Sequence, residues 1–187
     1  MKTVLYEKDG LIGRVTLNRP EKLNAINDDM PRDLEEAITL ANDDPDISVI
    51  ILSGNGKAFC SGYDLSEYAQ GNESNKFTQK MPWDPIKDYQ TMWNDTQHFM
   101  SIWKSLKPVI CKVHGFAIAG GSDIALCSDM IIMADNAEIG YMPSRVWGTP
   151  TTAMWVHRIG PEKAKKMLFT GDKINGKEAE KIGLVLE

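Results

Sequence analysis

The clearest indication of the fold class is in residues 109–134, VICKVHGFAIAGGSDIALCSDMIIMA. This stretch opens with an apolar, β-branched run over Val109–Val113, passes through several glycines and closes with a second apolar run over Met130–Ala134. Between the runs, Gly120–Cys127 has the pattern of a short helix that opens on two glycines. Strand, glycine-rich turn and helix in this order are typical of parallel β-α units. The sequence therefore predicts an α/β fold with a parallel sheet.

The N-terminal part adds strands and a helix to this unit. Val4–Tyr6 and Ile12–Leu17 alternate between apolar and polar residues around a short turn, as the strands of a β-hairpin do. Polar residues 27–29 predict the start of a helix over Met30–Ala41. The apolar run Ile47–Leu52 predicts a further strand, buried on both faces.

The second half of the chain is richer in helices. From Ile86 onward, a long amphipathic helix is predicted by side chains at helical spacing, namely Tyr89, Trp93, Thr96, Met100 and Trp103. We expect its tryptophans to pack in the core. Shorter helices are predicted over Thr151–His157, Pro161–Phe169 and Lys177–Ile182. The polar segment Gln70–Asp84 is predicted to be a loop, and Leu184–Glu187 to begin another strand.

Length and charge narrow the classes of function. The 187 residues suit one α/β domain with a hydrophobic core. Because 21 Lys and Arg stand against 26 Asp and Glu, no basic surface dominates and we expect no nucleic-acid binding. Cys60, Cys111 and Cys127 have no metal-ligand spacing, and residues 1–9 contain no apolar run. We therefore expect buried thiols in a cytoplasmic protein with no signal peptide, membrane span or metal site.

Two glycine-rich turns, Gly54–Leu65 and His114–Asp123, each follow a predicted buried strand. Glycines let backbone N–H groups approach a ligand closely. Turns on neighbouring parallel strands can aim one N–H each at a single oxygen. Asp123 comes three residues after Gly120, where it could stabilise the helix start or act as an acid or base. Its pKa could be raised by burial or lowered by the helix end.

Motifs spread along the whole chain resemble the crotonase (enoyl-CoA hydratase/isomerase) superfamily. They are the segments Asn18–Ala25, Gly54–Leu65, Lys107–Gly121, Cys127–Met130, Met142–Pro143, Arg158–Gly160, Thr170–Gly171 and Gly183–Val185. The resemblance implies a crotonase-like spiral of β-β-α units, with parallel sheets flanked by helices, as one core domain over residues 1–187. It also implies a homotrimer or hexamer, and a C-terminal helical trimerisation segment that is missing or truncated in this sequence.

The resemblance assigns roles to individual residues. The backbone N–H groups of Tyr63 and Gly120 match the family's oxyanion hole, and Asp123 and Ser144 stand where its hydratases carry two catalytic carboxylates. The residues implied to contact coenzyme A or the acyl group are Lys22, Ala25, Ser61, Gly62, Asp64, Leu65, Phe116, Gly121, Tyr141, Met142, Pro143 and Trp147. The implied partner is an acyl-CoA substrate, and no metal or redox cofactor is needed, since coenzyme A is part of the thioester.

The reactions that this site can catalyse depend on the presence of serine at position 144. A serine hydroxyl does not exchange a proton at neutral pH as a carboxylate does, so Asp123 would act alone as general base and acid. One hypothesis is a lyase that adds water across the C2–C3 double bond of an enoyl-CoA through an enolate. The alternatives are isomerisation or another enolate reaction by Asp123 alone, and acyl-CoA binding without catalysis. Arg145 could orient Asp123 or a substrate carboxylate, or form an ordinary ion pair.

Overall fold

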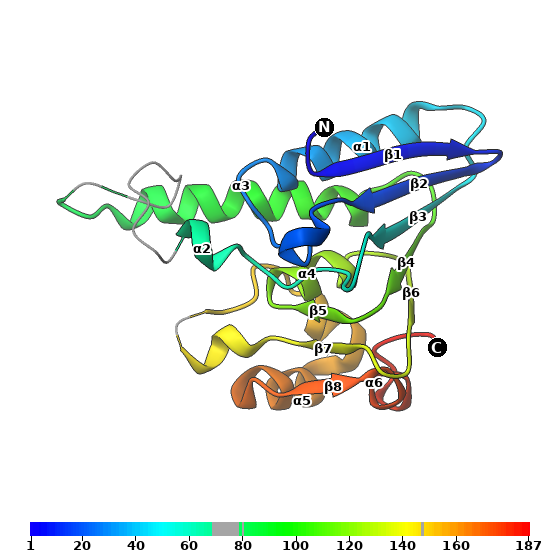
Figure 1. Ribbon diagram of the computed structural model, residues 1–187. Coiled ribbons are helices and arrows are strands. Elements are labelled where there is room, and N and C mark those ends of the chain that lie inside the picture. The colour runs from blue at the N-terminus through cyan, green and yellow to red at the C-terminus, as the bar shows by residue number, and fades with distance from the viewer. Residues whose placement is uncertain (69–78, 80, 147) are drawn as a thin grey trace.

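Two β-sheets form the centre of the computed structural model, which describes residues 1–68, 79, 81–146 and 148–187 (Figure 1). The larger sheet has the strand order β1-β2-β3-β4-β6. Its strands are β1 (Val4–Asp9), β2 (Ile12–Leu17), β3 (Val49–Gly54), β4 (Val109–Val113) and β6 (Met130–Met133). β1 and β2 form an antiparallel hairpin, and each pairing from β2 to β6 is parallel. The predicted α/β fold with a parallel sheet is confirmed.

The smaller sheet begins where the chain leaves the larger one after β4. The chain turns at Gly115, whose φ of +62° lies in the left-handed region that favours glycine, and enters β5 (Phe116–Ile118). β5 pairs in parallel with β7 (Glu138–Gly140), and β7 pairs antiparallel with β8 (Lys173–Asn175). A helix follows β4 and β5, and another follows β6 and β7. These are the β-β-α units that the predicted spiral requires.

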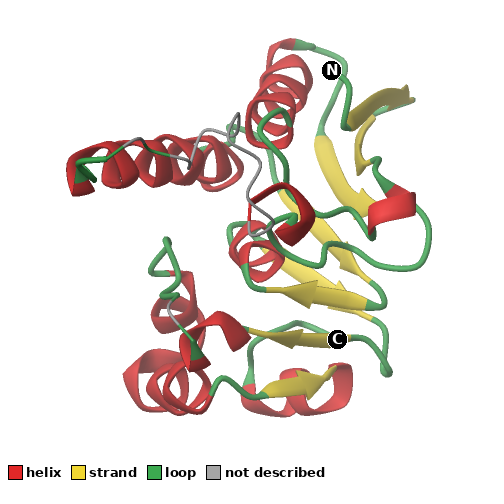
Figure 2. Cartoon of the chain, turned by 60° about the vertical axis from the view of Figure 1, so that its left-hand side comes forward, coloured by secondary structure: helices red, strands yellow, loops and turns green. Residues whose placement is uncertain are grey.

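The helices pack around and between the sheets. They are α1 (Met30–Asp43), α2 (Leu65–Tyr68), α3 (Pro85–Trp103), α4 (Gly120–Leu126), α5 (Met154–Thr170) and α6 (Gly176–Ile182), with 3-10 turns at Pro20–Lys22 and Met142–Arg145. α1 and α3 lie side by side at one end of the molecule, and α5 and α6 lie beside the smaller sheet (Figures 1 and 2). α4 contacts α3, α5 and β5. The start of α4 is therefore near the centre of the fold.

The strand predicted over Ile47–Leu52 differs from β3 in its bounds and its environment. β3 runs from Val49 to Gly54. Ile50 and Leu52 are fully buried, but the alternate residues Val49 and Ile51 are only half-buried. The expectation that both faces are buried is wrong, because this part of the sheet packs its core on one face and is covered only in part on the other.

The aromatic side chains of α3 contradict the expectation of core packing. Tyr89, Trp93 and Trp103 are 63%, 51% and 42% exposed. The buried side chains of the helix are instead Asp95, Thr96, Phe99 and Ile102. One end of α3 projects beyond the sheets (Figures 1 and 2). Helical spacing of apolar residues does not produce burial there, because the described part of the chain offers no element for Tyr89 and Trp93 to pack against.

The two helices predicted over Thr151–His157 and Pro161–Phe169 are both formed, within α5. The first starts at Met154, and the second follows Gly160, whose φ of +73° and ψ of 170° are not helical. The helix predicted over Lys177–Ile182 is confirmed as α6.

The expected strand over Leu184–Glu187 is not formed. The Leu186 N–H nevertheless donates to the Ile131 carbonyl at 2.9 Å, so this segment runs beside β6. The loop predicted over Gln70–Asp84 lies mostly outside the described residues. Among the helices that the structure describes, none combines the length and apolar character needed to cross a bilayer.

Candidate active site

The two glycine-rich turns lie against each other. The Ile118 N–H donates to the Cys60 carbonyl at 3.0 Å, which joins the two turns directly. A methyl group added at Gly62 would lie 3.8 Å from the Gly120 nitrogen. The backbone of Tyr63 follows directly, so the amides of Tyr63 and Gly120 belong to adjacent segments, as the family resemblance implies.

Ala119 holds the second turn in a backbone conformation that L residues rarely adopt. Its φ is +53° and its ψ is −123°, and such conformations cost of order 1–3 kcal/mol. The Ala119 N–H donates to the Gly140 carbonyl at 3.0 Å, which ties the turn to β7. The next amide, that of Gly120, has no acceptor among the described residues. The strained turn thus presents one N–H whose hydrogen-bonding capacity is unused.

Close packing explains why glycine occupies positions 120 and 121. A Cβ at Gly121 would lie 2.5 Å from the Cys60 carbonyl oxygen. A Cβ at Gly120 would lie 2.7 Å from the Ile26 Cδ1 and 3.1 Å from the ring of Tyr63. The ring of Tyr63 therefore lies directly against the start of α4.

Asp123 is the buried carboxyl of this site. It follows Gly120 by about one helical turn and is 1% exposed. The Thr152 hydroxyl donates to its Oδ1 at 3.2 Å. Burial raises the pKa of Asp123 to about 7, and hydrogen bonds from Thr152 and Thr151 offset part of that rise. Of the two effects expected on the pKa of Asp123, the rise caused by burial is therefore larger than any lowering by the helix start. A carboxyl that titrates near neutral pH is suited to accept and to donate a proton.

The charge of Asp123 contributes to the pKa values of two nearby phenols and one thiol. Burial, and then the charge of Asp123, raise the pKa of Tyr141 and the pKa of Cys127, the latter to about 12. Burial raises the pKa of Tyr63 well above its ordinary value, and the charges of Asp95 and Asp123 add to the rise. All three groups are therefore protonated at neutral pH and can act as hydrogen-bond donors.

Asp95 is a residue of this site that the sequence did not reveal. It lies on α3 and is 4% exposed. The Tyr63 hydroxyl donates to its Oδ2 at 3.2 Å. A signal was present, since Asp95 shares the helical face of Phe99 and Ile102, where a charged residue is unusual.

Ser144 and Arg145 lie in the 3-10 turn after β7. The Ser144 hydroxyl donates to the Tyr141 carbonyl at 2.9 Å, and no hydrogen bond joins it to Asp123 in the described part of the chain. Arg145 forms an ion pair with Asp172 at 2.7 Å. Of the roles considered for Arg145, the structure shows the ordinary ion pair.

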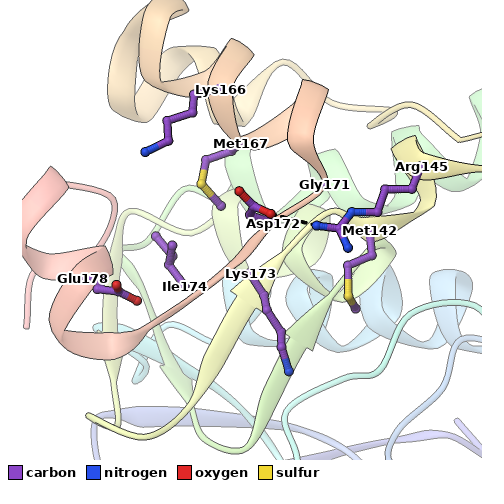
Figure 3. A pocket seen from close by; sticks show the side chains of 9 residues that line it. All are labelled: Met142, Arg145, Lys166, Met167, Gly171, Asp172, Lys173, Ile174 and Glu178. Atoms are coloured by element: carbon purple, nitrogen blue, oxygen red, sulfur yellow. Dashed lines mark hydrogen bonds and ion pairs between the residues drawn. The ribbon is translucent and has the colours of Figure 1, made fainter.

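A cavity of about 390 Å³ lies beside this turn (Figure 3). It is lined by Met142, Arg145, Lys166, Met167, Gly171, Asp172, Lys173, Ile174 and Glu178. Neither Asp123 nor Tyr63 belongs to the lining.

The residues expected to hold coenzyme A lie near the first glycine-rich turn. Lys22 is exposed, with its Nζ 3.3 Å from the Ser66 hydroxyl, and Leu65 is 62% exposed. Asp64 is buried and forms an ion pair with Arg19 at 3.1 Å. Sequence reasoning missed Arg19, although it lies in the matched motif Asn18–Ala25.

The remaining residues expected to contact the substrate differ in how exposed they are to solvent. Ala25, Gly62, Gly121 and Tyr141 are buried, Ser61 and Pro143 are half-buried, and Phe116 is 38% exposed. Ala25 also offers its carbonyl to the Arg19 guanidinium. Trp147 lies outside the described residues.

The described residues contain no cluster of three or more His, Cys, Asp or Glu side chains that could hold a metal ion. Cys60, Cys111 and Cys127 are free and buried, as expected. Burial raises the pKa of each of these thiols to about 12, so they are packing residues and not nucleophiles.

A parallel sheet that continues into a second sheet, with two touching glycine-rich turns beside a buried carboxyl, defines an α/β protein of the crotonase fold. Residues 7–187 match the family model for enoyl-CoA hydratase/isomerase, and the chain belongs to that family.

The relatives agree with this assignment. A crystal structure of an enoyl-CoA hydratase from Mycobacterium smegmatis is 44% identical with a TM-score of 0.91, covering 100% of this chain and 65% of that one. A probable enoyl-CoA hydratase of Mycobacterium tuberculosis is 33% identical over 98% of this chain and 67% of the relative. A crotonyl-CoA hydratase of Syntrophomonas wolfei is 33% identical over 98% and 68%. The chain spans about two thirds of the length of these relatives.

Proposed function

We propose that this protein is a lyase that adds water across the C2–C3 double bond of 2-enoyl-CoA thioesters. The observation that carries the proposal is Asp123, a buried carboxyl with a pKa of about 7, about one helical turn from the Gly120 amide. The names of relatives, among them a crotonyl-CoA hydratase, support the same reaction.

Two backbone amides would make the thioester reactive. In the proposal, the N–H groups of Tyr63 and Gly120 donate to the thioester carbonyl oxygen. An oxygen that accepts two such bonds carries the negative charge of an enolate more easily, and each donor of this kind contributes about 3 kcal/mol to catalysis. The position of the two turns side by side supports this role.

Asp123 would exchange the protons of the reaction. Addition of water needs one proton removed from the attacking water and one delivered to C2. A carboxyl whose pKa lies near the working pH is populated in both forms, so it can serve as base and as acid.

The proposal includes an acyl-CoA partner, a trimeric or hexameric assembly and a cytoplasmic location. It needs no metal or redox cofactor, because the amides supply the charge stabilisation. Free, buried cysteines support a reducing compartment. Hydratase activity that survives exhaustive treatment with a chelator, together with a measured mass of three or six chains in solution, would support these points.

The test uses crotonyl-CoA as substrate and mass spectrometry of the product. Wild-type protein is expected to add the mass of one water. Asp123→Asn should lower kcat by about 10²- to 10⁴-fold while acyl-CoA binding persists. Asp135→Asn is the matched control, since this exposed carboxylate pairs only with Lys177 among the described residues. Unchanged turnover in Asp123→Asn would refute the proposal.

Isomerisation of the double bond is the second candidate, and Ser144 favours it. A site with one carboxyl can move a proton between C2 and C4 without activating water. Supply of a 3-enoyl thioester separates the two reactions, because isomerisation leaves the mass of the substrate unchanged and hydration does not.

A further inference from the structure

The proposed hydration gives one carboxyl, that of Asp123, both proton transfers. The Ser144 hydroxyl is committed to the Tyr141 carbonyl at 2.9 Å, so it does not take the place of a second carboxylate. A second proton-transfer group, if the fold provides one, must come from another element packed around Asp123.

Three titratable groups near Asp123 can be compared. The Tyr141 hydroxyl donates to the Thr149 carbonyl at 2.8 Å, and a carbonyl cannot take up the proton. The Cys127 thiol faces the Met100 sulfur at 3.9 Å within the core. The Tyr63 hydroxyl donates to a carboxylate, that of Asp95, at 3.2 Å. Of these groups, Tyr63 is the one whose proton has an acceptor that can hold it.

The position of the Tyr63 ring places it beside the reacting atoms. Its backbone N–H is one of the two amides proposed to hold the thioester oxygen. Its ring lies 3.1 Å from the point that a Cβ on Gly120 would occupy, and Gly120 carries the other amide. In the proposed complex, this ring would lie beside a thioester held by the two amides.

The hydrogen bond to Asp95 also sets the direction of the transfer. The Tyr63 hydroxyl donates to Asp95, and a phenol oxygen that donates one hydrogen bond can also accept one. Among the described residues, the charged or titratable groups near this phenol are Asp95 from α3, Asp123 from α4, Tyr141 after β7 and Tyr68 from α2. A carboxylate at Asp95 can accept a proton through Tyr63, whereas Asp123 can hold one.

We infer that the Tyr63 hydroxyl is a catalytic residue of this site and relays a proton from the attacking water to the buried Asp95 carboxylate. This inference rests on the proposed hydration and assigns removal of the water proton to Tyr63 in place of Asp123, while Asp123 still delivers the proton to C2. Asp95 acts through Tyr63 and is a positioning residue that receives the relayed proton. The pair takes the place of the carboxylate that Ser144 does not supply.

The step balances without any further reactant. As the water oxygen bonds to C3, the water gives a proton to the Tyr63 oxygen, and Tyr63 gives its own proton to Asp95. The π electrons of the C2–C3 bond move onto the thioester as an enolate, and C2 takes the proton held by Asp123. Exchange through water then moves the proton on Asp95 back to Asp123. One water is consumed, and nothing is oxidised or reduced.

Tyr63→Phe tests the relay, because it removes one oxygen and keeps the backbone amide and the ring. The matched control is Tyr68→Phe on the neighbouring helix α2. Its hydroxyl also donates to a carboxylate, Asp28, at 2.7 Å, and its ring meets that of Tyr63 edge-on at 6.0 Å between centroids. The assay is hydration of crotonyl-CoA by the full chain, with kcat and KM determined from pH 5 to pH 10.

We expect Tyr63→Phe and Asp95→Asn each to lower kcat about 100-fold or more, with KM changed less than about threefold. The double variant should be no slower than the slower single variant, since both changes break one relay. Tyr68→Phe should retain wild-type kcat.

The outcomes separate this inference from the proposed function. If wild-type protein hydrates crotonyl-CoA and Tyr63→Phe does so at a similar kcat, the relay is refuted and the hydratase stands. If wild-type protein does not hydrate crotonyl-CoA, both fall. Should Tyr63→Phe fail to fold, Asp95→Glu must recover activity that Asp95→Asn lacks, because it restores a carboxylate. Equal kcat in these two variants also overturns the relay.

Discussion

Replacement of Asp123 by Asn should make the protein more stable at alkaline pH while it lowers activity. The carboxyl is 1% exposed, and burial raises its pKa from 3.8 to about 7. That rise corresponds to about 4 kcal/mol in the free energy of unfolding, which the ionised wild-type carboxyl costs the folded state. An asparagine of the same shape carries no charge and avoids this cost.

The direction of this pH dependence follows from which state, folded or unfolded, keeps the proton of Asp123. Between pH 4 and pH 7 the unfolded chain has lost the proton of Asp123 and the folded chain keeps it, so wild-type stability falls as the pH rises. Above about pH 7 both states are ionised at this position and the contribution is constant. The advantage of Asp123→Asn should therefore be small near pH 4, grow to pH 7 and remain near 4 kcal/mol at pH 8.

Asp123→Asn should keep most of this gain in stability, because the new side chain can still form hydrogen bonds with its neighbours. Thr152 can still donate to the amide oxygen of Asn, as it does to Asp123 at 3.2 Å. Thr151 also lies beside this carboxyl, and its hydroxyl oxygen can accept a hydrogen bond from the new N–H₂ group. Urea unfolding of both proteins from pH 4 to pH 9 measures the difference. A difference that does not change with pH, or a wild type that is more stable at pH 8, would falsify the reasoning.

Other contacts give outcomes that are simpler to measure. Gly121→Ala should destabilise the fold by about 3 kcal/mol in urea unfolding, because the new Cβ would meet a backbone carbonyl oxygen at 2.5 Å. Gly120→Ala meets flexible side-chain atoms first and should fold, but with reduced kcat because it displaces the ring of Tyr63. Arg19→Met should lower the free energy of unfolding by about 3 kcal/mol, since it removes the partner of the buried Asp64. Arg145→Gln should cost less than about 1 kcal/mol and leave hydration unchanged, because its ion pair with Asp172 is exposed.

The elements with strong local signals were predictable from sequence. β4 was predicted at its observed bounds, and the β1-β2 hairpin and α1 were predicted close to theirs, because alternation, turn residues and helical spacing act over a few residues. The two glycine-rich turns and Asp123 were also found, since a glycine pair directly after an apolar strand is a local pattern. That the turns touch follows from parallel pairing of neighbouring strands.

Features that depend on distant packing were not predictable. The hydrogen bond from Tyr63 to Asp95 joins residues on two elements, and nothing in either local sequence fixes their approach. The exposure of Trp93 depends on how far α3 extends past the sheets, not on its helical pattern. The pKa of Asp123 likewise depends on the segment at Thr151 and Thr152 that closes over it, nearly thirty residues later in the chain.

The three buried thiols make chemical labelling a measure of how often this molecule opens. With pKa values of about 12, they contain almost no thiolate at pH 8, and solvent does not reach them in the closed state. A maleimide can therefore react only during a local opening. Cys60 reports on the first glycine-rich turn, Cys111 on strand β4, and Cys127 on the end of α4. Peptide masses collected over time would rank the lifetimes of these regions in the unmodified sequence.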